Sequence, residues 1–139
     1  MKFGFDVHGV LDTHHEMYSA LSIALMKEGH EVHVVTGAQQ TPELEAKLKG
    51  YGIVWSHWFS IVQYHLDLGD TLVTFDGDQP WMDKDIWNRT KAEYCEKVGI
   101  ALLIDDSPVY GSYFMGDTVY CLQKHPKAQE AWMTLAGRI

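Results

Sequence analysis

The most apolar run of the sequence, residues 100–104 (Ile-Ala-Leu-Leu-Ile), stops abruptly at two acidic residues, Asp105 and Asp106. An unbroken apolar run of this length predicts a strand buried on both faces, as the central strands of parallel sheets are. In open parallel sheets, ligands bind in the crevice outside the carboxyl ends of the strands. The run therefore predicts an α/β fold and places polar chemistry at one edge of its sheet.

The other expected elements alternate between strand and helix, which is typical of a doubly wound parallel sheet. Strands are expected at 3–7, 31–35, 53–61, 100–104 and 118–122, and helices at about 13–28, 42–50, 83–98 and after Pro126. A capping box, Thr13 to Glu16, is expected to begin the first helix. Pro108 is expected to begin a short helix, and residues 62–82 are expected to form a hairpin or flap. The prediction is one domain over residues 1–139: a three-layer, Rossmann-like, mainly parallel sheet of about five strands.

Composition limits the class of partner. The formal net charge of -8 opposes binding to nucleic-acid backbones, which depends on clustered Lys and Arg. A small phosphate ester remains possible if a bound cation offsets the local charge. Neither a membrane span nor a signal peptide is expected, and Cys95 and Cys121 match no metal or disulfide pattern. These features together favour a cytoplasmic protein.

Polar residues follow three of the expected strands at the point where each strand ends. Asp6 ends the first strand, Thr36 and Gly37 end the second, and Asp105 and Asp106 end the strand at 100–104. Carboxylates gathered at one place repel each other unless a cation joins them, and hard oxygen ligands favour Mg²⁺. The sequence thus predicts a magnesium site at this edge.

The helix at 83–98 adds a positive charge to its apolar face. Trp87, Lys91, Tyr94 and Cys95 follow one another at helical spacing, and a lysine on a packing face is unusual. Lys91 is therefore expected to reach toward the strand ends. The alternative is a structural lysine whose ammonium extends to the rim of the helix.

These residues together resemble the motifs of the haloacid dehalogenase (HAD) superfamily. Residues 6–12 (Asp-Val-His-Gly-Val-Leu-Asp) are similar to its first motif, residues 34–37 (Val-Val-Thr-Gly) to its second, Lys91 to its third and residues 103–108 (Leu-Ile-Asp-Asp-Ser-Pro) to its fourth. The resemblance covers residues 3 to about 115. The segments between the motifs are shorter than the ~50 residues of a separate domain, so a small member without a cap domain is expected.

The resemblance implies a Mg²⁺-dependent phosphomonoester hydrolase. Asp6 would attack phosphorus and form an aspartyl-phosphate, and Lys91 would stabilise the nucleophile and the transferring group. The metal ligands would be Asp6, the backbone carbonyl of His8, and Asp105 or Asp106.

Phosphate oxygens would bind to Thr36 and to the amides near Gly9 and Gly37.

A receiver domain of two-component signalling shares these residue types. There, however, the acidic pair ends the first strand and the lysine follows the last, so the order of residues in this chain opposes that alternative.

His8 departs from the pattern of the family. HAD phosphatases usually carry a second Asp at this position as general acid and base. Either His8 performs that role with a different pH profile, or turnover is slow and the chain is a phosphate- or metal-binding protein with weak or no hydrolase activity. The other histidines, His14 and His15 included, are expected to be structural or exposed; among them His30, His33, His57, His65 and His125 show no paired metal spacing.

The expected substrate is a small phosphorylated metabolite or a nucleotide. Nucleic acid and membranes are not expected partners. Without a cap domain the site would be open, which suits a bulky substrate or coverage by another subunit of a homo-oligomer.

Overall fold

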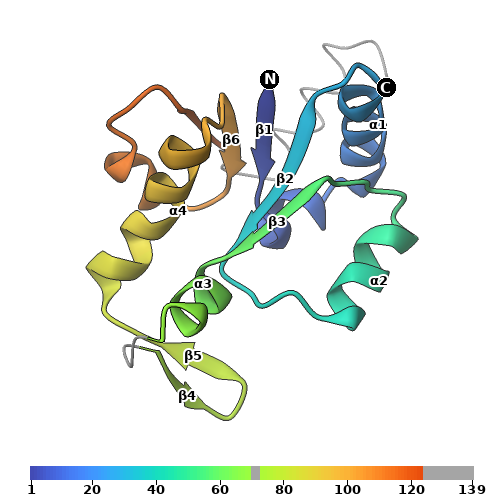
Figure 1. Cartoon of the computed structure of the whole chain (residues 1–139). Coiled ribbons are helices and arrows are strands. Elements are labelled where there is room, and N and C mark those ends of the chain that lie inside the picture. The colour runs from blue at the N-terminus through green and yellow to red at the C-terminus, as the bar shows by residue number, and fades with distance from the viewer. Residues whose placement is uncertain (70–72, 124–139) are drawn as a thin grey trace.

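Five parallel strands form one sheet in the order β3-β2-β1-β6-β7, so β1 lies at its centre (Figure 1). The computed structural model describes residues 1–69 and 73–123. The strands are β1 (Lys2–Phe5), β2 (Glu31–Thr36), β3 (His57–Ser60), β6 (Leu102–Asp105) and β7 (Val119–Leu122). The predicted α/β class and parallel sheet are confirmed, and the strands that precede Asp6, Gly37 and Asp106 are neighbours.

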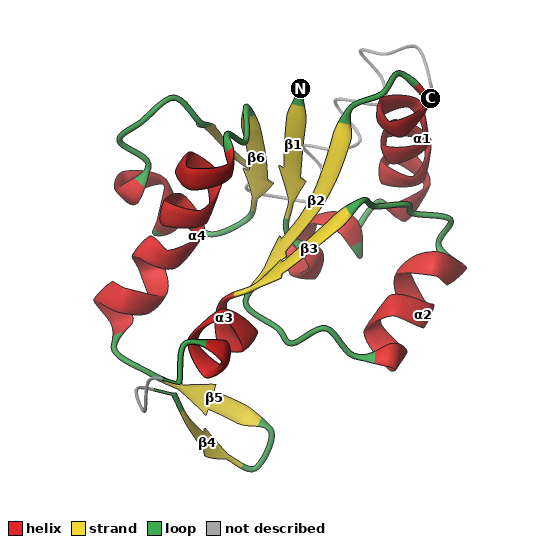
Figure 2. Ribbon diagram, viewed as in Figure 1, coloured by secondary structure: helices red, strands yellow, loops and turns green. Residues whose placement is uncertain are grey.

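Helices cover both faces of this sheet (Figure 2). They are α1 (His15–Lys27), α2 (Pro42–Gly50), α3 (Ile61–Asp67) and α4 (Lys84–Val98), with a short 3₁₀ helix, η2, at Tyr110–Tyr113. Alternate residues of β2 divide the core: Val34 packs in the cluster beneath α1 and α2, whereas Val35 packs with Leu103 and Cys95 beneath α4. Since both faces are covered, the residues of β6 before Asp105 are apolar on both sides, as predicted for the run at 100–104.

The ends of α2 and α4 follow the sequence signals. Thr41 accepts a hydrogen bond from the Leu44 amide at 3.2 Å, and Pro42 is the first residue of α2. Asp83 caps α4, and Gly99 ends it with a positive φ of 81° that favours glycine. The short helix expected after Pro108 is η2, which begins two residues later.

The predicted capping box of the first helix does not form. The Thr13 hydroxyl donates to the Val10 carbonyl at 2.7 Å instead, and His14 occupies the cap position without a side-chain cap. Thr13 is used to close the turn that follows β1, η1 (Val7–Leu11), so it is not available to α1.

Residues 53–82 differ from the prediction in two respects: the strand is shorter than expected, and α3 (Ile61–Asp67), which was not predicted, occupies the start of the expected flap. β3 is shorter than the strand expected at 53–61, and its last residue, Ser60, caps α3 by accepting from the Gln63 amide at 3.1 Å. The expected hairpin follows as β4 (Thr74–Asp76) and β5 (Gln79–Trp81), which are antiparallel. The helix expected after Pro126 lies outside the described residues.

Within residues 1–69 and 73–123, no helix combines the length and the apolar character that a membrane-spanning segment needs.

Asp83 offers a test of how α4 is held. Its Oδ1 accepts from the amides of Asp85 and Ile86 at 2.9 and 3.1 Å. Asp83→Ala leaves both donors without this partner, and we expect it to lower the free energy of unfolding by about 1 kcal/mol. Urea denaturation measures the change. Asp83→Ser keeps a capping oxygen and is the matched control; equal loss in both variants would contradict the capping role.

Candidate functional site

The carboxyl ends of β1, β2 and β6 lie together because of the register of the sheet. Phe5 is opposite Val34 on one side and Ile104 on the other. Asp6 and Asp105 follow Phe5 and Ile104 and therefore emerge side by side. Carboxylate oxygens of Asp6, Asp105 and Asp106 all lie within 4.8 Å of one another. The predicted acidic cluster is thus present, and its oxygen ligands fit Mg²⁺.

Lys91 lies inside this cluster and does not extend to the rim of its helix. Its side chain is 1% exposed, and its Nζ lies 2.6 Å from Asp105 Oδ2 and 3.1 Å from Asp6 Oδ1. The ring of Tyr110 flanks the ammonium, with its centroid 4.9 Å from Nζ. The structural alternative, a lysine reaching toward solvent, is therefore wrong.

The surroundings of the cluster keep Lys91 charged and raise the pKa of the Asp6 carboxyl. Burial alone would lower the pKa of Lys91, but Asp6 and Asp105 outweigh it and the pKa rises. Burial raises the pKa of Asp6 to about 6 despite the attraction of Lys91, and the charge of Asp105 adds to the rise. One lysine thus does not compensate for all the carboxylates nearby.

The backbone fixes the orientation of the Asp6 carboxylate. The Asp6 amide donates to the Ile104 carbonyl at 3.0 Å, and Asp6 Oδ1 accepts from the Val7 amide at 2.9 Å. Both contacts come from residues that the sheet or the following turn holds in place.

Gly9 allows the turn after Asp6 to pass close to the acidic pair. Its φ is 83°, and a Cβ at this position would lie 2.0 Å from Asp106 Oδ2. Any other residue would be strained and would displace the Asp106 carboxylate.

The His8 side chain is exposed and is held by Asp12. The ring is 62% exposed, and Nδ1 lies 3.2 Å from Asp12 Oδ2. A carboxylate only accepts, so we assign the proton to Nδ1, which leaves the lone pair on Nε2. Asp12 also accepts from the Gly9 amide at 2.8 Å, so the amide expected to bind phosphate has a partner within the chain.

The second expected phosphate-binding pair ends β2. Thr36 is 1% exposed, and its hydroxyl accepts from the Ala38 amide at 3.3 Å. Gly37 lies against the Trp87 ring, because a Cβ there would come within 2.7 Å of it. Trp87 in turn donates to the Tyr110 hydroxyl at 2.8 Å.

Three residues of the site were not predicted. Asp12 orients His8, Tyr110 flanks Lys91, and the side-chain Nε2 of Gln123 donates to the Gly9 carbonyl at 2.6 Å. Asp12 is four residues after His8, a spacing that the sequence did show. Gln123 follows β7 and had no comparable signal.

A cavity of about 560 Å³ lies beside this edge, between the start of α2 and the β4–β5 hairpin. Its lining includes Ala38, Leu44, Lys47, Val62, Phe75 and Pro80, but not Asp6. Lys47 connects this cavity to the turn after β1, since it lines the cavity and its Nζ lies 4.0 Å from Asp12 Oδ2.

No model of a known protein family matches the chain, and no curated protein matches it either. Its function is therefore inferred from the chemistry of the site.

The raised pKa of Asp6 predicts that Asp6→Asn stabilises the protein when no divalent cation is bound. The folded pKa of about 6 exceeds the ordinary value of 3.8, so the folded state holds this proton more tightly than the unfolded chain does. Stability contributed by this group is present below about pH 4 and lost as the pH rises through 6. A shift of about two pH units corresponds to a cost of roughly 3 kcal/mol at neutral pH.

We expect Asp6→Asn to raise the free energy of unfolding by about 1–3 kcal/mol at pH 7.5 and to change it little at pH 4. Urea denaturation in EDTA at both pH values measures the difference. Asp117→Asn, at an exposed carboxylate, is the control. A variant less stable than the native chain at pH 7.5 would show that the ion pair with Lys91 outweighs the burial of Asp6.

Proposed function

We propose that the chain is a Mg²⁺-dependent phosphomonoester hydrolase that acts through an aspartyl-phosphate on Asp6. The main support is the pairing of Asp6 with the buried Lys91, 3.1 Å away, beside two further carboxylates at the strand ends. The resemblance of residues 3–115 to the HAD superfamily implies the same reaction. The position of β1 between β2 and β6 agrees with this resemblance, because the residues similar to the first, second and fourth motifs then follow neighbouring strands.

In the first step, Asp6 attacks phosphorus. Its Oδ1 already contacts the Val7 amide and Lys91, so we assign the attack to Oδ2. A bond forms between Oδ2 and phosphorus as the ester P–O bond breaks, and the departing alkoxide takes a proton. Water then attacks the phosphorus, the bond to Asp6 breaks, and phosphate and the free carboxylate result.

Lys91 supports both steps as a fixed positive charge. Because it is buried and held by Asp105, its position changes little as charge moves onto the phosphoryl oxygens.

A bound Mg²⁺ offsets negative charge and orients the phosphoryl group. Asp6, the His8 carbonyl and one residue of the acidic pair would hold it. Asp105 already uses both oxygens, with Ser107 N at 2.9 Å and Lys91 Nζ at 2.6 Å. The exposed Asp106 is therefore the better candidate for the third ligand.

His8 is the group that we assign to proton transfer. Protonated at both nitrogens, it gives the Nε2 proton to the leaving alkoxide, and it later takes a proton from the attacking water. Asp12 fixes the orientation of the ring through Nδ1 and stabilises the imidazolium. Asp12 is thus a positioning residue.

The cavity beside the site suits the remainder of the substrate. Its volume, about 560 Å³, is within the range of about 300–1,000 Å³ that is typical of small-molecule pockets. Its apolar residues and the Lys47 ammonium would suit the remainder of a small phosphorylated metabolite or a nucleotide, whereas Glu43 and Asp78 in the same lining would repel a further phosphate group.

The alternative is a phosphate- or metal-binding protein with weak or no hydrolase activity. The largely exposed His8 side chain favours weak or no hydrolysis. The Gly9 amide is bound to Asp12, which opposes phosphate binding at that amide under either hypothesis. An anion would have to displace Asp12 before it could bind that amide.

The nucleophile is tested by phosphate release from p-nitrophenyl phosphate. We expect activity that requires Mg²⁺ and is removed by EDTA. Asp6→Asn should lower kcat by at least about 10³-fold, since no bond to phosphorus can form through the carboxylate. Asp117→Asn should keep native activity. Full activity in Asp6→Asn would refute the proposed mechanism.

The role of His8 is tested by three variants and a pH–rate profile. If His8 transfers protons, His8→Ala and Asp12→Asn should lower kcat by about 10²–10⁴-fold and about 10-fold or more, respectively. Both should remove or shift the neutral limb of the profile. His8→Asp distinguishes the alternatives: a fall in activity supports a working His8, whereas a rise of orders of magnitude supports the binding protein.

A further inference from the structure

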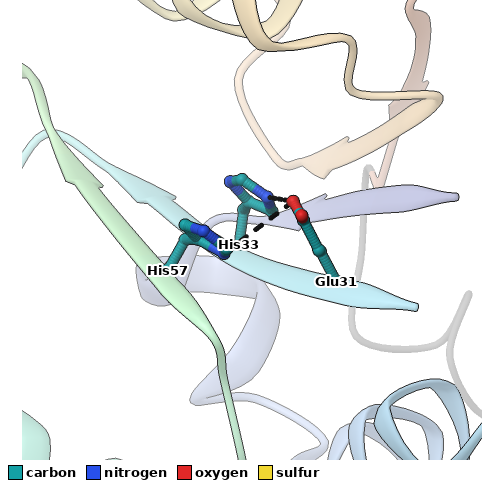
Figure 3. A group of neighbouring side chains, drawn as sticks. All are labelled: Glu31, His33 and His57. Carbon is teal, nitrogen blue, oxygen red and sulfur yellow. Dashed lines mark hydrogen bonds and ion pairs between the residues drawn. The ribbon is translucent and has the colours of Figure 1, made fainter. Parts of the chain in front are cut away.

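Glu31, His33 and His57 form a second cluster (Figure 3). It lies toward the amino ends of β2 and β3, whereas Asp6 follows the carboxyl end of β1. Glu31 and His33 belong to the beginning of β2, and His57 is the first residue of β3. The sequence showed no paired metal spacing for these histidines, because His33 and His57 are far apart in the chain. The parallel register places His57 directly opposite His33 and brings them together.

We propose that Glu31, His33 and His57 bind a divalent transition-metal ion of the Zn²⁺ class. One imidazole nitrogen from each histidine and one carboxylate oxygen all lie within 4.8 Å of one another. Glu31 Oε2 is 2.7 Å from His33 Nε2 and 3.9 Å from His57 Nδ1. Around a tetrahedral ion with bonds of about 2.0–2.2 Å, ligand atoms stand roughly 3.3–3.6 Å apart, so these two distances need changes of about half to one ångström.

The side chains share one face of the sheet. Residues 31 and 33 alternate with Val32, which packs on the α1 side, so both face α4. The His33 and His57 rings are stacked, with centroids 4.3 Å apart and planes inclined by 7°. A rotation of the more exposed His57 ring would direct its nitrogen toward the ion. If Nδ1 is the ligand, its contact with Ser56 Oγ, now 2.9 Å, is released.

The surroundings of His33 resemble those of metal-binding histidines. Its Nε2 lies 2.7 Å from Glu31 Oε2 and its Nδ1 2.6 Å from the Tyr94 hydroxyl. Glu31 only accepts, so without an ion the proton is on Nε2 and Tyr94 donates to Nδ1. An ion at Nε2 would require the other tautomer, in which Nδ1–H donates to the Tyr94 oxygen and supports the ligand.

The site is open on one side only. The side chain of His33 is 3% exposed, whereas those of Glu31 and His57 are 38% and 50% exposed, so an ion can enter past His57 and retain water. Lys2 is the neighbouring cation, with Nζ 4.0 Å from Glu31 Oε2; it also donates to the Val98 carbonyl at 2.7 Å, which holds it toward α4. Two imidazoles and one carboxylate favour Zn²⁺ or Co²⁺ over Mg²⁺, which prefers oxygen ligands.

The bound ion would join the edge strand β3 to β2. Since it binds the folded chain, it would raise thermal stability with the logarithm of its concentration relative to the Kd. This role is independent of the hydrolase proposed for the other edge.

The test uses the full chain, stripped with EDTA and titrated with Co²⁺. We expect one equivalent to produce visible absorption bands from nitrogen ligation, Zn²⁺ to abolish them, and Zn²⁺ to raise Tm. His57→Ala, at an exposed position, should weaken binding at least 100-fold, and Tyr94→Phe should weaken it about 10-fold.

Two controls separate this site from others. His15→Ala removes an exposed imidazole elsewhere, and Asp106→Asn alters the acidic cluster; both should keep the Co²⁺ bands and the Zn²⁺-dependent rise in Tm. The proposal is overturned if the native chain gives no bands, or if the bands survive His57→Ala.

Discussion

The ion pairs of the buried Lys91 with Asp6 and Asp105 connect three parts of the chain. A lysine that is 1% exposed requires compensating charge, because the loss of both carboxylate partners would leave an uncompensated buried charge. The sheet supplies both carboxylates from neighbouring strand ends. The helix α4 must therefore pack in one register, and Trp87, one turn before Lys91, fixes that register by packing against Gly37. The geometry of the candidate site and the packing of α4 on the sheet therefore depend on each other.

The charges at this edge remain unbalanced. Lys91 compensates for Asp105 and partly for Asp6, yet the pKa of Asp6 stays raised, and burial together with the charge of Asp105 raises the pKa of Asp106 as well. A second cation would relieve this repulsion, which is the physical reason to expect Mg²⁺ here. Burial is the larger cause of the raised pKa of Asp6 and the charge of Asp105 adds to it, so a charged carboxylate at this position is expected to lower the stability of the chain when no cation is bound.

Local signals in the sequence predicted the elements whose formation depends on local chemistry. The apolar run before Asp105, the cap at Thr41 and the stop at Gly99 act within a few residues, and each appears where expected. The failures depend on tertiary packing. Thr13 contacts the turn behind it instead of capping α1, and Ser60 begins α3 where a strand was expected to continue. The pair of His33 with His57 depends on strand register, which no spacing along the chain reveals.

The strand β2 contributes to both edges of the sheet. Thr36 stands at its carboxyl end, beside Asp6, and Glu31 at its amino end, beside His57. Five steps of about 3.3 Å place the backbones of these residues about 16 Å apart, too far for any shared ligand. The two edges also differ in chemistry, since carboxylates with a lysine suit a hard cation and phosphate, whereas imidazoles suit a transition metal. An ion at the amino edge can therefore affect the other edge only through the stability of the sheet, and its loss should leave the geometry around Lys91 unchanged.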